Sequence, residues 1–305
     1  MNKRQVGSSD LFVSEIGLGC MSLGTDEKHA KSIVDHALDL GINFFDTADL
    51  YDFGVNEEIV GKALKNRRHD IILATKVGNR WSDNKDGWYW DASKQYIIET
   101  VKDNLRRLQT DYIDLYQLHG GTIEDHIDDT IDAFEQLKRE GVIRQYGISS
   151  IRPNVIREFV NKSSIVSVMM QYSVLDRRPE ELFSMLQKNN IHIIARGPLA
   201  KGILTEKPLM NAGKKVLEKG YLHYTYEELS HVRSEVTAIC NNRSLTEIAL
   251  QYCLHSSEVA TVIPGASRNE QLIENVEGAA TIGLTNSQYS KIQEVTKTNK
   301  YELHR

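Results

Sequence analysis

The chain has 305 residues, of which 40% are hydrophobic and 26% are charged, as is ordinary for a globular protein. Its formal net charge of -5 does not favour nucleic acid or membrane partners. Its three cysteines are far apart, and their spacing indicates neither a disulfide framework nor a metal site. Since no signal-peptide core and no run of about 18 apolar residues is present, we expect a cytoplasmic protein.

Two short segments around Gly7–Asp10 predict a β-hairpin at the start of the chain. After it, strand patterns alternate with helix patterns, which requires right-handed parallel crossovers. Eight such units predict an α/β fold, a (β/α)8 TIM barrel, and no linker divides the chain, so residues 1–305 are expected to form one domain. The predicted strands are Ile16–Gly19, Ile42–Asp46, Ile71–Lys76, Tyr112–His119, Gln145–Ser149, Ile165–Gln171, His192–Arg196 and Ala260–Pro264; the predicted helices lie near 27–40, 55–66, 93–108, 124–140, 152–161, 179–190, 227–240, 244–256, 269–279 and 285–299.

Two segments are longer than plain connections, and loops of this kind are often functional. Gly78–Asp91 holds all the tryptophans of the chain, Trp81, Trp88 and Trp90. The segment is either a flap packed on the barrel rim or an aromatic wall of a substrate pocket. The second segment, Ala200–Tyr226, is a candidate lid.

Three successive predicted strands end in polar side chains, Asp46, Lys76 and His119, and Tyr51 follows the first of them. Singly, each has a plain structural explanation: a turn cap, a solvated strand end and a satisfied core histidine. The carboxyl ends of barrel strands, however, surround the active site. The sequence therefore predicts a carboxylate, a phenol, an ammonium and an imidazole around one mouth.

Proton delivery is the chemistry that this set of groups favours. A free phenol has a pKa of about 10, too high for an efficient acid near neutral pH, and a neighbouring ammonium stabilises the phenolate. A carboxylate would hold that ammonium in place, and an imidazole would orient a reacting carbonyl. The set suits neither covalent hydrolysis nor metal catalysis.

The motifs around these residues are DTADLY followed by Gly54 and Glu57-Glu58, then ILATKVG, DLYQLHG, YGISS, MMQYSVLDR, GPLAKGIL and IPGASRNEQLIEN. In this order and spacing they resemble aldo-keto reductases over nearly the whole chain. The resemblance is closest to the bacterial NADPH-dependent branch and extends to the β subunits of voltage-gated potassium channels. It implies an oxidoreductase that reduces aldehydes and ketones to alcohols with NADPH.

The resemblance also implies roles for individual residues. Tyr51 would be the general acid, and Asp46, Lys76 and His119 would complete a catalytic tetrad. The implied NADPH-binding residues are Gly19, Cys20 and Met21 after the first strand, Ser149, Ser150 and Gln171 at the nicotinamide carboxamide, Arg196 at its ring, Gly197, Pro198, Leu199, Ala200, Lys201 and Gly202 around the pyrophosphate, and Gly265, Ser267, Arg268, Gln271 and Asn275 at the adenosine end.

Three positions depart from the family pattern. Ser150 stands where asparagine is frequent, and Arg196 replaces the aromatic residue that stacks on the nicotinamide, although a planar guanidinium can also lie flat on a ring. Gly265 replaces the usual basic residue, which leaves Arg268 as the expected partner of the 2′-phosphate. The alternative is a surface arginine that caps a helix.

A Rossmann fingerprint fails because Ser22 occupies the third glycine site after Gly17 and Gly19. A cofactor-occupancy sensor on the same barrel stays open, because fold does not fix function; turnover of aldehydes with NADPH would discriminate the two. We expect a monomer, and the short tail Tyr301–Arg305 leads us to expect an open pocket on its side.

Overall fold

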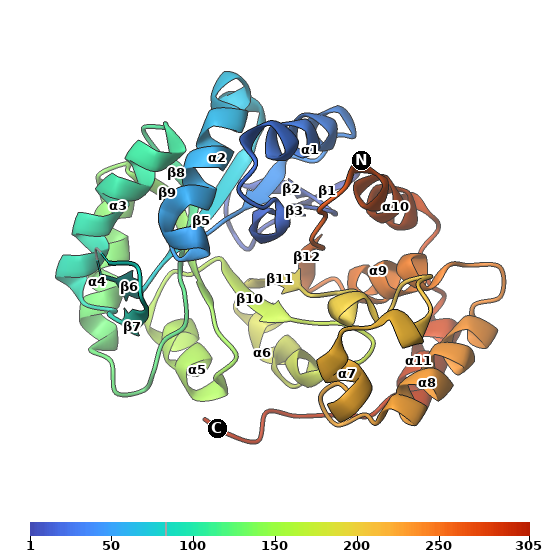
Figure 1. Ribbon diagram of the computed structural model, residues 1–305. Helices are drawn as coiled ribbons and strands as arrows, with labels where there is room; N and C mark the ends of the chain where they lie inside the picture. The colour runs from blue at the N-terminus through green and yellow to red at the C-terminus, as the bar shows by residue number, and fades with distance from the viewer. Residues whose placement is uncertain (83) are drawn as a thin grey trace.

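A computed structural model describes residues 1–82 and 84–305 of the chain. Within these residues, parallel strands form one sheet of eight strands that curves into a barrel, with helices around its outside (Figure 1). The barrel closes where the Gly17 amide donates to the Val262 carbonyl at 2.9 Å. The predicted TIM barrel is confirmed. Its strands are β3 (Leu18–Gly19), β4 (Phe44–Asp46), β5 (Ile72–Val77), β8 (Ile113–Leu118), β9 (Ile143–Ser149), β10 (Ser167–Gln171), β11 (His192–Arg196) and β12 (Val259–Ile263).

The helices pack an apolar stripe on the sheet, and several of them begin at capping residues. The Asp26 side chain accepts from two amides at the start of one helix, and Thr225 and Glu228 form a capping box at another. Within the described residues, no helix is long and apolar enough to cross a membrane. The helices are α1 (Glu27–Asp39), α2 (Val55–Leu64), α3 (Lys94–Leu108), α4 (Ile127–Arg139), α5 (Pro153–Lys162), α6 (Phe183–Lys188), α7 (Lys214–Lys219), α8 (Tyr226–Ile239), α9 (Leu245–His255), α10 (Asn269–Ala280) and α11 (Asn286–Val295).

The predicted N-terminal hairpin is present and closes the barrel floor. Its strands β1 (Lys3–Gln5) and β2 (Phe12–Ser14) pair antiparallel. The turn between them brings Val6 and Leu11, together with Val13, into the apolar cluster that fills the barrel interior. Because this end of the barrel is plugged by side chains, the opposite end is left for a site.

Both long segments contain structure that the sequence did not predict. Gly78–Asp91 carries an antiparallel hairpin, β6 (Asn79–Trp81) and β7 (Trp88–Trp90). The segment after β11 contains helix α7 and a bridge between Tyr221 and Tyr224. The helix expected over 285–299 is shorter, since α11 ends at Val295 and the chain continues as a tail.

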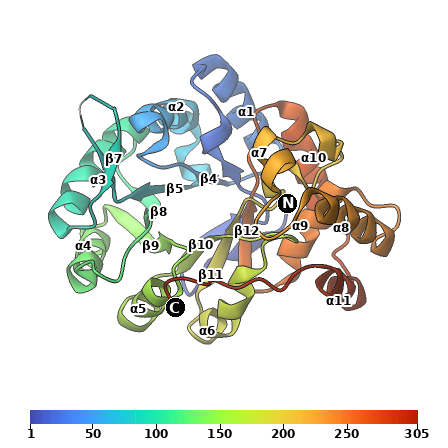
Figure 2. The ribbon, with the colours of Figure 1, turned by 60° about the horizontal axis from the view of Figure 1, so that its bottom comes forward.

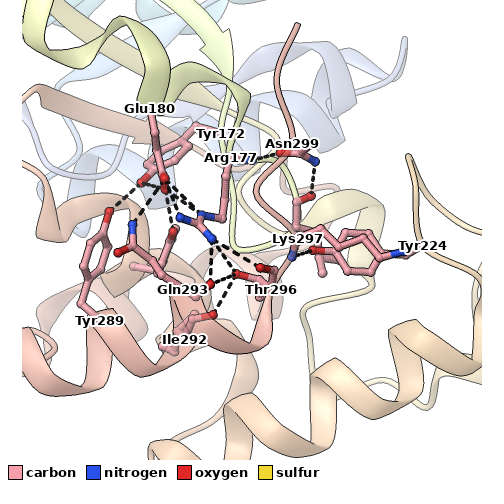
Figure 3. A network of polar contacts seen from close by, with 12 residues as sticks. Tyr172, Arg177, Glu180, Tyr224, Tyr289, Ile292, Gln293, Thr296, Lys297 and Asn299 are labelled. Atoms are coloured by element: carbon pink, nitrogen blue, oxygen red, sulfur yellow. Dashed lines mark hydrogen bonds and ion pairs between the residues drawn. The ribbon is translucent and has the colours of Figure 1, made fainter. Parts of the chain in front are cut away.

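That tail is fixed to the barrel by a network of polar contacts (Figure 3). Arg177 pairs with Glu180 at 2.9 Å, and its backbone amide donates to Asn299 Oδ1 at 2.9 Å. The Lys297 amide donates to the Tyr224 hydroxyl at 2.6 Å. Figure 2 shows the tail running from α11 past α6 to α5. Tyr301 is buried within it, so the end of the chain packs on the barrel.

Candidate active site

The predicted polar strand ends lie together at the carboxyl end of the barrel. β4 buries Phe44 and Phe45 and ends at Asp46, while Lys76 is on β5. His119 directly follows β8, and its amide donates to the Val77 carbonyl at 2.7 Å. Alternate residues of a strand point to one face, which directs these side chains inward at the mouth.

Lys76 is the centre of the group and is fully buried. Its Nζ donates to Asp46 Oδ2 at 2.7 Å, to the Thr47 carbonyl at 2.6 Å and to the Tyr51 hydroxyl oxygen at 3.4 Å. These contacts use the three hydrogens of the ammonium. Because Lys76 donates to the phenol oxygen, the phenol hydrogen is free to point to another acceptor.

The electrostatics keep the lysine charged and the histidine neutral. Burial alone would lower the pKa of Lys76, but Asp46 and Tyr51 together outweigh burial and raise that pKa. Burial, followed by the charges of Lys76 and Arg196, lowers the pKa of His119 to about 3. The His119 ring meets the Tyr51 ring edge-on at 6.0 Å between centroids. A neutral imidazole can donate a hydrogen bond to a carbonyl without adding a charge.

The turn that carries Tyr51 has a strained backbone and packs against a side chain from helix α3. Asp52 and Phe53 have φ values of 49° and 51°, and Gly54 follows at 86°. A Cβ at Gly54 would meet Arg107 Cδ at 2.9 Å, so glycine is required there. Arg107 reaches this place from α3 and pairs with the buried Glu57 at 2.7 Å. The backbone next to the phenol is therefore held by packing from another helix.

The residues expected at the nicotinamide lie at the ends of the next three strands. Ser149, Gln171 and Arg196 end β9, β10 and β11, and each is half-buried. Ser150 is buried, and its hydroxyl accepts from the Arg152 amide at 3.2 Å, so that hydroxyl already has a partner. The departure at Ser150 thus coincides with a local structural role.

The segment expected at the pyrophosphate has an open, permissive backbone. Gly197 and Gly202 have φ values of 67° and 85°, and a Cβ on either would meet nothing within 4 Å. Ala200 and Lys201, between them, also have positive φ. Such a loop leaves room for a diphosphate against backbone groups, so it fits a dinucleotide. Of the predicted side chains here, Pro198 and Ala200 are buried, while Leu199 is half-buried.

The residues expected at the adenosine end adjoin the first strand. Gly19 bridges Gly265, and Ser22 Oγ donates to the Ala266 carbonyl at 3.4 Å. Arg268 is exposed where α10 begins, a place that favours a phosphate. Of the other predicted residues, Ser267 donates to Gln271 Oε1 at 3.1 Å, Cys20 and Asn275 are buried, and Met21 is 64% exposed.

The three tryptophans occupy different environments. Trp81 packs edge-on against Phe53, beside the Tyr51 turn, with 6.1 Å between ring centroids. Trp90 donates to Asp125 Oδ1 at 2.8 Å and covers Gly78. Trp88 is 56% exposed. Trp90 thus packs as a flap, and Trp81 lies beside the turn that carries Tyr51.

Sequence reasoning missed the residues that support Asp46 and Thr47. Gln117 Nε2 donates to Asp46 Oδ1 at 3.3 Å. Thr47 Oγ1 donates to Asn56 Oδ1 at 2.7 Å, and Asn56 Nδ2 donates to the Cys20 carbonyl at 2.9 Å. The signal for Gln117 was available, since it stands two residues before His119 and so points inward from the same strand.

With this geometry described, comparison with known proteins gives a decisive match. The model of the aldo/keto reductase family matches residues 15–297. The chain belongs to the aldo/keto reductase family. The expected resemblance to aldo-keto reductases is confirmed, and membership supports oxidoreductase activity on carbonyl compounds with a nicotinamide dinucleotide.

Individual aldo/keto reductases agree with this assignment. The chain is 60% identical over 305 residues to the uncharacterized oxidoreductase YqkF of Bacillus subtilis (strain 168), covering all of both chains. It is 58% identical to the solved holo form of aldo-keto reductase AKR11C1 from Bacillus halodurans, with a TM-score of 0.95 and coverage of 100% of this chain and 99% of that one. The NADH-specific methylglyoxal reductase of Escherichia coli (strain K12) is 29% identical over 323 residues, covering 97% of this chain and 99% of the relative.

Proposed function

We propose that the protein reduces aldehydes and ketones to alcohols with NADPH, and that Tyr51 is the proton donor. When bound, the dinucleotide supplies the hydride, which no side chain of the tetrad can provide. The observation that carries the proposal is the Lys76 ammonium, which is anchored by Asp46 at 2.7 Å and donates to the Tyr51 oxygen at 3.4 Å.

In this proposal each side chain has one task. The Tyr51 hydroxyl donates its proton to the carbonyl oxygen as negative charge develops there. The Lys76 ammonium stabilises the phenolate that remains, and Asp46 keeps Lys76 in position. The neutral His119 imidazole holds the carbonyl oxygen by a hydrogen bond, which orients the substrate.

The dinucleotide would be held by the strand ends and loops around the mouth. Ser149 and Gln171 suit the carboxamide, the open loop Gly197–Gly202 suits the pyrophosphate, and the start of α10 suits the adenosine end. The Arg196 guanidinium would stack on the nicotinamide ring. Arg268 would select NADPH over NADH, a preference that is not shared by every relative, since one is named as NADH-specific.

A panel of aldehydes and ketones tests the reaction, with consumption of NADPH and NADH followed by absorbance. We expect turnover of some carbonyl compounds, faster with NADPH than with NADH at equal concentration. Tight NADPH binding without turnover of any compound would instead support a cofactor-occupancy sensor. Size-exclusion chromatography under assay conditions tests the expected monomer.

A further inference from the structure

A glutamine lies inside the barrel beside the tetrad, level with Lys76. Gln117 on β8 is fully buried, and the sheet register pairs it with Lys76 on β5. The inward position before it on the same strand, Leu115, belongs to the apolar cluster that fills the barrel. A buried amide costs free energy unless its groups are hydrogen-bonded, so this placement needs a physical reason.

The reason is found at the Asp46 carboxylate. Gln117 Nε2 donates to Asp46 Oδ1 at 3.3 Å, while Lys76 Nζ donates to Oδ2 at 2.7 Å. The carboxylate is thus held at both oxygens, from two adjacent strands. Lys76 uses its other hydrogens on Thr47 and Tyr51, so it has none left for Oδ1.

The Gln117 amide is oriented so that its NH2 group binds Asp46 while its oxygen is left without a partner. Gln117 Oε1 is buried and has no hydrogen-bond partner in the described residues. An unpaired buried acceptor is destabilising, and such costs are typical of functional sites. The amide contacts the Asp46 carboxylate on β4 and pairs in register with Lys76 on β5. The other charged or titratable groups near that carboxylate and ammonium are Cys20 after β3, Tyr51, His119 after β8 and Arg196 at the end of β11.

We propose that Gln117 is a positioning residue of the reaction: its amide fixes the Asp46 carboxylate so that the opposite oxygen holds Lys76 against Tyr51. Gln117 acts through Asp46 and touches neither substrate nor cofactor. The inference rests on the proposed reductase function, because it assigns the amide a role in delivering the Tyr51 proton.

The first test removes the donor at nearly constant length. Gln117→Met should lower kcat about ten- to a hundredfold and leave KM and NADPH affinity within about twofold, because the effect lies in proton delivery. Gln145→Met is the matched control. Gln145 is on the adjacent strand β9, opposite Leu115, and its amide oxygen is also buried without a partner. The control should keep its kcat.

The second test has a pH signature that a merely structural role would not give. In Gln117→Glu, the introduced carboxyl lies beside Asp46, and two such groups share a proton. While protonated, its O–H can replace the amide as donor. We therefore expect kcat relative to the wild type to be close to one at acidic pH and to fall as the pH rises, whereas the ratio for Gln117→Met stays constant. The pH series is measured on a single folded preparation of each protein, so a loss of folded protein in the variant cannot produce the pH dependence.

A third measurement needs no turnover. In ¹⁵N-labelled protein, the Gln117 side-chain amide, identified by its loss in Gln117→Met, should shift upfield in Asp46→Ala. An unchanged amide signal, a pH-independent ratio for Gln117→Glu, or equal kcat values for Gln117→Met and Gln145→Met would overturn the inference. If the wild type turns over no carbonyl compound, the proposed function has failed instead, and the amide signal still decides whether the contact exists.

Discussion

The phenol of Tyr51 is the one group of the tetrad whose loss should affect chemistry without affecting binding. Tyr51→Phe removes the transferred proton but keeps the ring beside His119. We expect kcat to fall about 10²- to 10⁴-fold with NADPH affinity unchanged, measured by steady-state kinetics and cofactor titration. Tyr112→Phe, at the opposite end of β8, is the control. A near-normal kcat in Tyr51→Phe would remove Tyr51 from this role.

Arg268 should decide between the two dinucleotides. The 2′-phosphate is the feature that distinguishes NADPH, and an arginine fork binds it with charge-assisted hydrogen bonds. Arg268→Ala should weaken NADPH binding about ten- to a hundredfold, or about 1.5–3 kcal/mol, and leave NADH binding unchanged. Fluorescence titration measures both. The exposed Arg139 on α4 gives a control, Arg139→Ala, for general loss of charge. Equal weakening for both cofactors would count against the assignment.

His119 should make stability depend on pH in a defined direction. Its pKa in the folded protein is lowered to about 3, whereas an unfolded chain has about 6.5. The unfolded state thus takes the proton more readily, so stability falls as the pH drops below about 6.5 and continues to fall toward 3. Between pH 8 and 5 this titration lowers the free energy of unfolding by about 2 kcal/mol.

His119→Asn removes that titration. Between pH 8 and 5, the free energy of unfolding measured in urea should fall by about 2 kcal/mol less in the variant than in the wild type, whatever the stability of the variant at pH 8. If the free energy of unfolding falls by the same amount in both proteins, the imidazole is not held neutral by its surroundings.

At the scale of single elements, the sequence predicted much of the site because its parts are local. Asp46 ends β4, Lys76 is the second-last residue of β5 and His119 directly follows β8, and the carboxyl ends of these strands meet at one mouth. The supports of these residues were not predicted, because they depend on packing between segments. The Thr47 carbonyl that binds Lys76 carries no side-chain signal, and the tail contact from Arg177 to Asn299 joins residues 122 apart.

Substitutions of the three tryptophans in the β6–β7 hairpin distinguish a role in substrate specificity from a role in stability. Trp81→Ala should change relative kcat/KM across a panel of aldehydes, because Trp81 lies beside the Tyr51 turn. Trp90→Ala should instead lower stability by about 3–5 kcal/mol, since it loses packing on Gly78 and a bond to Asp125. The exposed Trp88→Ala is the control. Unchanged relative specificity in Trp81→Ala would leave the hairpin as a packed flap only.

At the scale of the molecule, we propose that residues 1–305 fold as one domain. One hydrophobic cluster extends from Ile16 to Tyr301, so both ends of the chain share a core. Tryptophan fluorescence, which reports on 81–90, and far-ultraviolet circular dichroism should therefore give coincident urea transitions. Two separate midpoints would show that the chain contains units that unfold independently.

The closure of the barrel has a consequence for how the protein is made. Arg4 binds the carbonyls of Leu254 and Val259, and Gly17 pairs with Val262. The N-terminal segment therefore finds its hydrogen-bond partners only at the last barrel strand and the helix before it. These partners stand 250 and 255 residues apart. At about 5–20 residues per second, a ribosome needs roughly 12–50 s to supply them. For that time the N-terminal hairpin and the edge of the first strand stay uncovered in the nascent chain, which exposes this edge to aggregation until the chain is finished.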